Sequence, residues 1–157
     1  MSGQASKITF FVGILFVLAA CSRSSMYDEQ VTLPQEGWYK DELARFEVMV
    51  DDTIQGYDFF LNIRNNVEYR YSNLYLFMIT KFPNGNISRD TLECILATPE
   101  GKWLGKGWGA VRENTLLLNP NMRFPLKGKY EFLFQQAMRT DTLKDIRDIG
   151  IRITKSE

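Results

Sequence analysis

One short motif in the sequence predicts covalent chemistry, the run Leu18-Ala19-Ala20-Cys21. In bacterial lipoproteins, a run of this kind marks a cysteine that is acylated when a peptidase cuts the chain directly before it. Ala19 and Ala20 fit this role because the peptidase admits only small side chains beside the cut. We therefore expect lipidation at Cys21, which becomes the N-terminus of the mature protein.

The residues before this motif have the parts of a signal peptide. Lys7 provides a positive charge, and Ile8 to Leu18 form an apolar run of eleven residues. A helix needs roughly 20 apolar residues to span a bilayer, so this run is too short to span but suits a signal sequence. We predict a lipoprotein signal peptide at residues 1–20 and a lipidated, polar tether at residues 21–32. The alternatives are an ordinary secretory signal with a chance cysteine, or a short membrane anchor.

The composition argues against the common nucleophilic and metal-dependent active sites. The sequence has no histidine, so it contains neither a Ser-His-Asp triad nor a Cys-His pair. Asp90 and Glu93 are three residues apart on a predicted strand, so they face opposite sides and cannot act together as an acid pair. We expect no catalytic residue, no bound metal and no cofactor. A hydrolase that uses an unrecognised pair of carboxylates is the alternative.

The second cysteine, Cys94, is predicted to be a core residue. It is the only thiol left once Cys21 is acylated, which leaves no intrachain disulfide. Cys94 lies between Leu92 and Leu96 on the same predicted strand face, where a cysteine behaves as a small apolar side chain. A reactive nucleophile at this position is the less favoured interpretation.

The net charge gives no reason to expect a nucleic acid partner. The chain has 19 basic and 19 acidic side chains, and removal of residues 1–20 takes away only Lys7, which leaves 18 basic and 19 acidic. A nearly neutral domain has no electrostatic attraction for nucleic acid or for an anionic membrane surface. The lipid is therefore the expected link to the membrane.

Two tryptophans are the candidate binding residues. Trp103 and Trp108 lie in a segment from Thr98 to Gly109 that contains four glycines, which predicts a long shaped loop or a bulged edge. Exposed indoles on a β-sandwich can form a flat platform for sugar rings, and a protein partner would use the same residues. The structural alternative, which we favour, is that these indoles close the end of the sandwich.

Alternation of apolar and polar side chains predicts the scaffold that holds these residues. The predicted strands are 44–50, 57–64, 74–82, 87–97, 115–118, 130–138 and 149–154. Pro83-Asn84-Gly85-Asn86 predicts a hairpin turn, and Asn119-Pro120 is expected to end the strand before it. Seven or eight strands without long helical patterns predict an antiparallel, jelly-roll-like β-sandwich over residues 33–157.

The order of several motifs resembles the GldH family of gliding-motility-associated lipoproteins from the Bacteroidota. The resemblance covers about residues 33–153 in addition to the motif that ends at Cys21. The motifs that carry it are Gly37-Trp38, Ile63 to Asn66, Tyr71 to Leu74, Arg89 to Leu92, Gly101 to Gly105, Gln136 to Arg139 and Leu143 to Ile153.

The resemblance implies a non-enzymatic accessory or scaffold protein of the cell envelope, linked to gliding motility and its associated secretion machinery. Its expected partners are other envelope, gliding or secretion proteins. Of the functional positions, only Cys21 carries over from the family. Ser22 is not acidic, which by a rule learned in other bacteria favours the outer membrane. A carbohydrate-binding module that uses Trp103 and Trp108 is the alternative function.

Overall fold

Side-chain alternation determines which face of each strand is buried. The computed structural model describes residues 25–157, so Cys21 and the predicted signal peptide lie outside the described residues. In β3 (Ala44–Val50), buried and exposed residues alternate at every position. In β4 (Tyr57–Asn66), every second residue is buried and those between are half-buried. This period of two is what a strand with one face on an apolar core requires.

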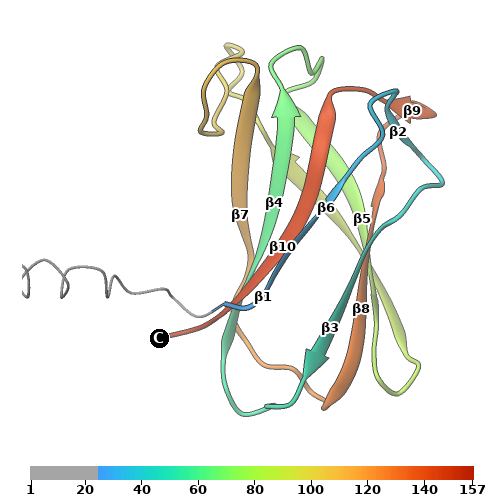
Figure 1. Ribbon diagram of the computed structural model, residues 1–157, viewed down its shortest axis with the longest axis vertical. Helices are drawn as coiled ribbons and strands as arrows, with labels where there is room; N and C mark the ends of the chain where they lie inside the picture. The colour runs from blue at the N-terminus through green and yellow to red at the C-terminus, as the bar shows by residue number, and fades with distance from the viewer. Residues whose placement is uncertain (1–24) are drawn as a thin grey trace, which may run out of the picture.

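Two four-stranded antiparallel sheets pack face to face (Figure 1). The first sheet has the order β1-β10-β4-β7, with β1 (Ser25–Thr32), β10 (Ile146–Lys155) and β7 (Val111–Met122) beside β4. The second has the order β3-β8-β5-β6, with β8 (Gly128–Gln136), β5 (Asn73–Lys81) and β6 (Ile87–Ile95). Two short strands, β2 (Trp38–Tyr39) and β9 (Thr142–Leu143), pair at one end.

The predicted all-β antiparallel sandwich is confirmed. Residues 25–157 contain ten strands, not seven or eight, because the sequence pattern did not predict β1 or the two-residue strands β2 and β9. The long strands pair in nested order, β1 with β10, β3 with β8, β4 with β7 and β5 with β6. Such nesting is the winding expected of a jelly roll, in which one long folded hairpin wraps around the core.

The hairpin between β5 and β6 forms where the sequence predicts it. Gly85 has a φ of +86°, which a residue with a side chain rarely adopts. The Phe82 and Asn86 backbones are joined across the turn by a hydrogen bond of 2.9 Å.

An aromatic row fills the lower half of the core between the sheets. Phe59 of the first sheet and Phe132 of the second have ring centroids 4.9 Å apart, in a tilted arrangement. Tyr130 continues the row to Phe124, with centroids 5.0 Å apart, and its hydroxyl donates to the Leu126 carbonyl at 3.0 Å. Such rings bury large apolar areas, and Tyr130 also satisfies its hydroxyl inside the core.

The predicted tether is wrong from residue 25 onward, because Ser25–Thr32 form strand β1. Tyr27 and Val31 pair with Ile153 and Ile149 of β10 and pack against the core, while Glu29 between them is exposed. The Thr32 hydroxyl donates to the buried Asp148 carboxylate at 2.7 Å and fixes the end of the strand. The segment looked like a tether because an edge strand supplies few apolar side chains, and backbone pairing holds it instead.

The strand predicted to end before Asn119-Pro120 continues through both residues as β7, which ends at Met122. Proline lacks the N–H that a central strand needs, but β7 lies at the edge of its sheet, where one side of the backbone has no strand partner. The register with β4 shifts between Tyr57 and Phe60, close to the proline. The strand therefore accommodates Pro120 by local irregularity.

Two leucines on neighbouring strands give a matched test of this packing. Leu61 of β4 is fully buried between the sheets, whereas Leu117 of β7 is 49% exposed. We expect Leu61→Ala to lower the free energy of unfolding by about 2–5 kcal/mol, because it leaves a cavity. Leu117→Ala should change it by only about 0.5 kcal/mol. Urea unfolding followed by tryptophan fluorescence measures both, and equal losses would contradict the burial described here.

Candidate functional site

The predicted lipidation site, Cys21, lies outside the described residues, but the strand that follows it is placed. Ser25 pairs with Thr154 of β10, and Thr154 pairs with Asp58 of β4. The described chain therefore begins near the start of β4, in the lower part of Figure 1.

The three tryptophans have three different environments. Trp38 is fully buried, and its indole N–H donates to the Glu42 carbonyl at 2.9 Å. Trp103 is half-buried and packs against the core, beside a β-bridge between its own backbone and Ala97. Trp108 is 97% exposed. The favoured interpretation, in which both loop indoles close the end of the sandwich, therefore fits Trp103 but not Trp108.

Trp108 stands at the tip of an ordered hairpin in the connection from β6 to β7. Lys106 and Glu113 exchange two backbone hydrogen bonds of 2.9 and 2.7 Å at its base. Gly107 and Gly109, on either side of the indole, have φ values of +143° and +63°, which a side chain would strain. At Gly107, a Cβ would also lie 2.5 Å from the Val111 carbonyl oxygen. Glycine is therefore the residue that this turn requires at positions 107 and 109.

Further hydrogen bonds hold the tip of the turn in place. The Arg112 guanidinium donates to the carbonyls of Gly109 and Val111, both at 2.8 Å. The Val67 N–H, from the connection between β4 and β5, donates to the Ala110 carbonyl at 2.8 Å. The turn is therefore fixed both internally and against a neighbouring connection, and it presents Trp108 in a defined position.

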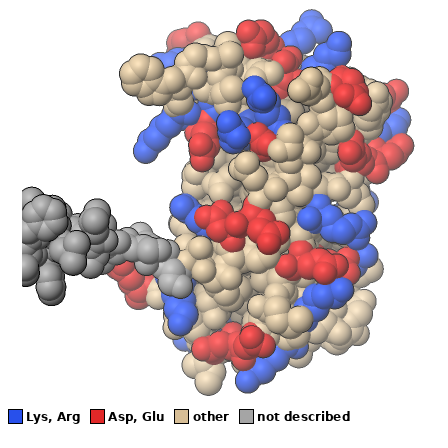
Figure 2. Space-filling view, viewed as in Figure 1, with Lys and Arg blue, Asp and Glu red and all other residues tan. Residues whose placement is uncertain are grey.

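A groove of about 550 Å³ lies beside this hairpin, between the end of β6 and the first half of β7. Ile95, Leu104 and Leu116 supply apolar side chains, and Lys106 and Glu113 supply charges. Ile95 is 49% exposed and Leu104 is 56% exposed. In Figure 2, the upper-left corner, at the level where Figure 1 draws the β6–β7 connection, projects as uncharged atoms with basic and acidic groups beside it. We call the hairpin 106–113 with this groove the Trp108 surface.

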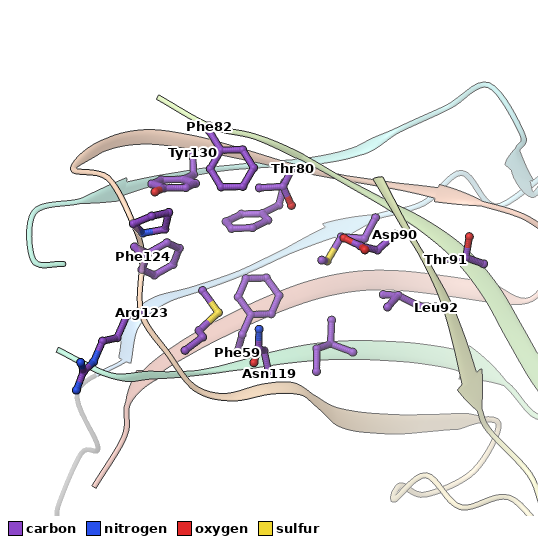
Figure 3. Close-up of a pocket in the computed structure, with 15 residues that line it drawn as sticks. Phe59, Thr80, Phe82, Asp90, Thr91, Leu92, Asn119, Arg123, Phe124 and Tyr130 are labelled. Carbon is purple, nitrogen blue, oxygen red and sulfur yellow. The ribbon is translucent and has the colours of Figure 1, made fainter. Parts of the chain in front are cut away.

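A second cavity, of about 500 Å³, opens between the two sheets at the β6 and β7 edges (Figure 3). Phe59, Phe82, Phe124 and Tyr130 project into it from both sheets, and Asp90 lies at its other end. Most of its aromatic lining belongs to the buried core, and Thr80, Asp90, Thr91, Asn119 and Arg123 add polar side chains to the walls.

The carboxylates Asp90 and Glu93 point in different directions, and the Cys94 thiol is buried. Asp90 faces the cavity between the sheets, whereas Glu93 faces outward and accepts a hydrogen bond from the Asn73 amide at 2.7 Å. Cys94 is 1% exposed, and burial raises the pKa of its thiol to about 12. The predicted core role of Cys94 is thus confirmed by its surroundings.

Residues 25–157 show neither a metal-binding cluster nor a membrane-spanning helix. No cluster of three or more histidine, cysteine or acidic side chains is arranged to hold a metal ion in this range. Over the same range, no helix has the length and apolar character needed to cross a bilayer.

Trp108 was predictable from the sequence as a candidate binding residue, but the groove beside it was not. Ile95 and Leu104 are nine residues apart and belong to a strand end and a loop, so no periodic pattern connects them. The signal that was present is the pair of glycines around Trp108, since paired glycines at a turn tip leave the residue between them without covering side chains.

The chain is similar to proteins of one family along almost its whole length. The profile of the GldH lipoprotein family matches residues 25–153. A protein of Christiangramia forsetii, named gliding motility lipoprotein GldH homolog, is 40% identical and covers 98% of this chain and 98% of its own length. The gliding motility lipoprotein GldH of Flavobacterium johnsoniae is 31% identical, over 92% of this chain and 96% of its own.

Among solved structures, an arabinose-bound GH51 α-L-arabinofuranosidase covers 80% of this chain with 19% of its own length. The two are 10% identical, and the TM-score is 0.38, which is too low to carry an argument about fold or function.

The rate at which the buried Cys94 thiol reacts tests whether it can act as a nucleophile. In a Cys21→Ser background, Cys94 is the only thiol, and at pH 8 we expect an aromatic disulfide reagent to label it far more slowly in native protein than in urea. A pKa raised from 9.0 to about 12 makes the native thiolate population about a thousandfold smaller. The folded state binds the thiol proton more tightly than the unfolded state does. Burial of the neutral thiol therefore adds its full contribution to the free energy of unfolding below pH 9, and this contribution declines as the pH rises toward 12. Rapid labelling of the native protein would show that Cys94 is accessible after all.

Proposed function

The chain belongs to the GldH lipoprotein family, and we propose that it is a lipid-anchored scaffold protein of the cell envelope that contributes to gliding motility by binding other proteins. Membership makes it a gliding motility lipoprotein. The non-enzymatic mode of action and the protein contacts are our proposal.

The anchor in this proposal is the acylated Cys21. The motif that ends at Cys21 supports it, as does the apolar run of eleven residues before the motif. Only three residues separate Cys21 from Ser25, where β1 begins. Four residue steps span at most about 14 Å, so the folded body stays close to the membrane that holds the lipid. Ser22 supports placement at the outer membrane.

The observation that carries a contact-based role is the exposure of Trp108. An indole that is 97% exposed buries almost none of the large apolar area that such a side chain usually contributes to a fold. The turn that holds it is ordered by hydrogen bonds from Arg112 and Val67. Tryptophan is also one of the residues that most often dominate the energy of protein interfaces. Binding explains this arrangement better than stability does.

The carbohydrate-binding alternative has weaker support. A sugar platform of the kind considered from the sequence needs Trp103 and Trp108 exposed together. Trp103 packs against the core, while Trp108 stands clear of it. The platform therefore lacks its second ring.

Replacement of Cys21 tests the anchor, and Cys94 provides the matched control. We expect Cys21→Ser to abolish incorporation of labelled palmitate and to leave the protein unprocessed or outside the membrane fraction. Cys94→Ala should keep both the label and the membrane retention, because its side chain is inside the core. Palmitate labelling, fractionation and mass spectrometry of the N-terminus measure these outcomes. A processed, membrane-retained Cys21→Ser protein would contradict the anchor.

Deletion of the gene tests the role in movement. In a gliding host that depends on its own family member, replacement of that gene by this one should restore movement of single cells over a surface, and Cys21→Ser should not restore it. Wild-type protein that is produced and anchored but restores no movement would count against the proposed role.

A further inference from the structure

We propose that the Trp108 surface is the docking site for a second envelope protein, one that offers an apolar pocket bordered by carboxylates, and that this surface faces away from the membrane that holds the lipid. The proposal rests on the lipid anchor at Cys21 and names the contact through which the scaffold acts.

The hairpin is already ordered in the protein without a partner. Two backbone hydrogen bonds join Lys106 to Glu113, and the Arg112 guanidinium bonds two carbonyls at the tip. Gly107 and Gly109, which flank Trp108 and have positive φ values, carry no side chains that could cover the indole. A partner therefore gains the area of the indole without having to order the turn first, which is the usual cost of loop-mediated binding.

The surroundings of Trp108 suit a protein partner. Leu104 and Ile95 add exposed aliphatic area beside the groove of about 550 Å³. A knob next to an apolar groove can interdigitate with side chains of a second protein, and a tryptophan inserted into a pocket is a common centre of such interfaces. A sugar ring would need a flat aromatic neighbour, which Trp103 does not provide because it packs against the core.

The charges at the hairpin specify the border of the partner pocket. Lys106 precedes Trp108 by two residues and lines the groove, and the Arg112 guanidinium lies at the tip of the turn. These two cations flank the indole along the chain, and Glu113 is the acidic group at the base of the hairpin. Carboxylates around the receiving pocket would complement the two cations and guide the approach of the partner.

The position of the anchor decides which way this surface points. Ser25 is level with Asp58 at one end of β4, and Val111 is level with Asn66 at the other, eight residues further on. At roughly 3.3 Å per residue, the two levels are about 26 Å apart. The strand order β1-β10-β4-β7 also puts the hairpin at the sheet edge opposite β1. A tether from Cys21 that spans about 14 Å at most therefore holds the diagonally opposite corner of the body.

The charges on the outer face of the first sheet disfavour an orientation in which this face lies against the bilayer. This outer face carries ionisable side chains, among them Asp28, Asp58, Arg64 and Arg152. Figure 2 shows acidic and basic groups spread over the viewed face of the molecule. Burial of such groups against lipid is costly. The upright arrangement, with Trp108 away from the bilayer, is the one the charges favour.

Site-specific photocrosslinking in cells tests the proposal with the full-length lipoprotein. The probe is p-benzoylphenylalanine at position 108, and the control is the same probe at position 54. Ile54 is 81% exposed and lies in the connection that leads into β4, at the anchor end. We expect a discrete protein adduct at 108 that is absent at 54, with an apolar pocket and neighbouring carboxylates in the captured protein.

Binding of the purified captured protein to the lipoprotein in detergent then measures the contact. Trp108→Ala should weaken the affinity at least tenfold, Trp108→Phe should weaken it less, and Lys106→Glu should weaken it in a salt-dependent way. Ile54→Ala should leave it unchanged, and unchanged unfolding midpoints exclude a folding defect in the Trp108 variants.

Several outcomes would overturn the proposal. They are adducts to phospholipid or glycan at 108, the same adducts at 108 and 54, a captured second copy of this chain, and full affinity in Trp108→Ala. If the wild-type chain restores movement in the deletion host and Trp108→Ala restores it equally, the docking site is wrong and the family role stands. If the wild-type chain itself restores nothing, the failure belongs to the proposed function.

Discussion

Burial of one face of β10 is the interaction on which the rest of the arrangement depends. Ile149, Ile151 and Ile153 are fully buried, and the strand that carries them pairs with β1 on one side and with β4 on the other. Without this apolar face, β1 has no partner, since its own side chains are mostly polar. The C-terminal strand thus fixes the first described strand, β1, in the sheet.

The same pairing sets the distance between the first described residue and the Trp108 surface. β4 lies next to β10 and runs from the level of Ser25 to the level of Val111, where the hairpin with Trp108 emerges. The sandwich therefore separates Ser25 from the Trp108 surface by about the length of one strand. Between these two ends the core is apolar, and burial there raises the pKa of the Cys94 thiol to about 12 and keeps it in the neutral form at neutral pH.

The sequence was informative wherever one side of a strand faces the core. Alternation located β3, β4 and β10, and Asn84-Gly85 located the hairpin between β5 and β6. It failed at β1, where edge pairing needs little apolar area, and at Pro120, which an edge strand tolerates. For the site, it could not separate Trp103 from Trp108. Trp103 and Trp108 lie in the same glycine-rich segment, one after a lysine and the other after a glycine. Only tertiary packing against the core distinguishes them.

The edges of the sandwich bear on how these molecules coexist at a crowded membrane. β6 and β7 each have one side without a strand partner among the described residues, and such edges invite pairing with a neighbour's backbone. Asp90 places a carboxylate on the inward face of β6, and Pro120 removes an N–H from β7. Both features oppose strand-by-strand polymerisation. Copies tethered at high surface density can therefore diffuse past one another without stacking into fibrils.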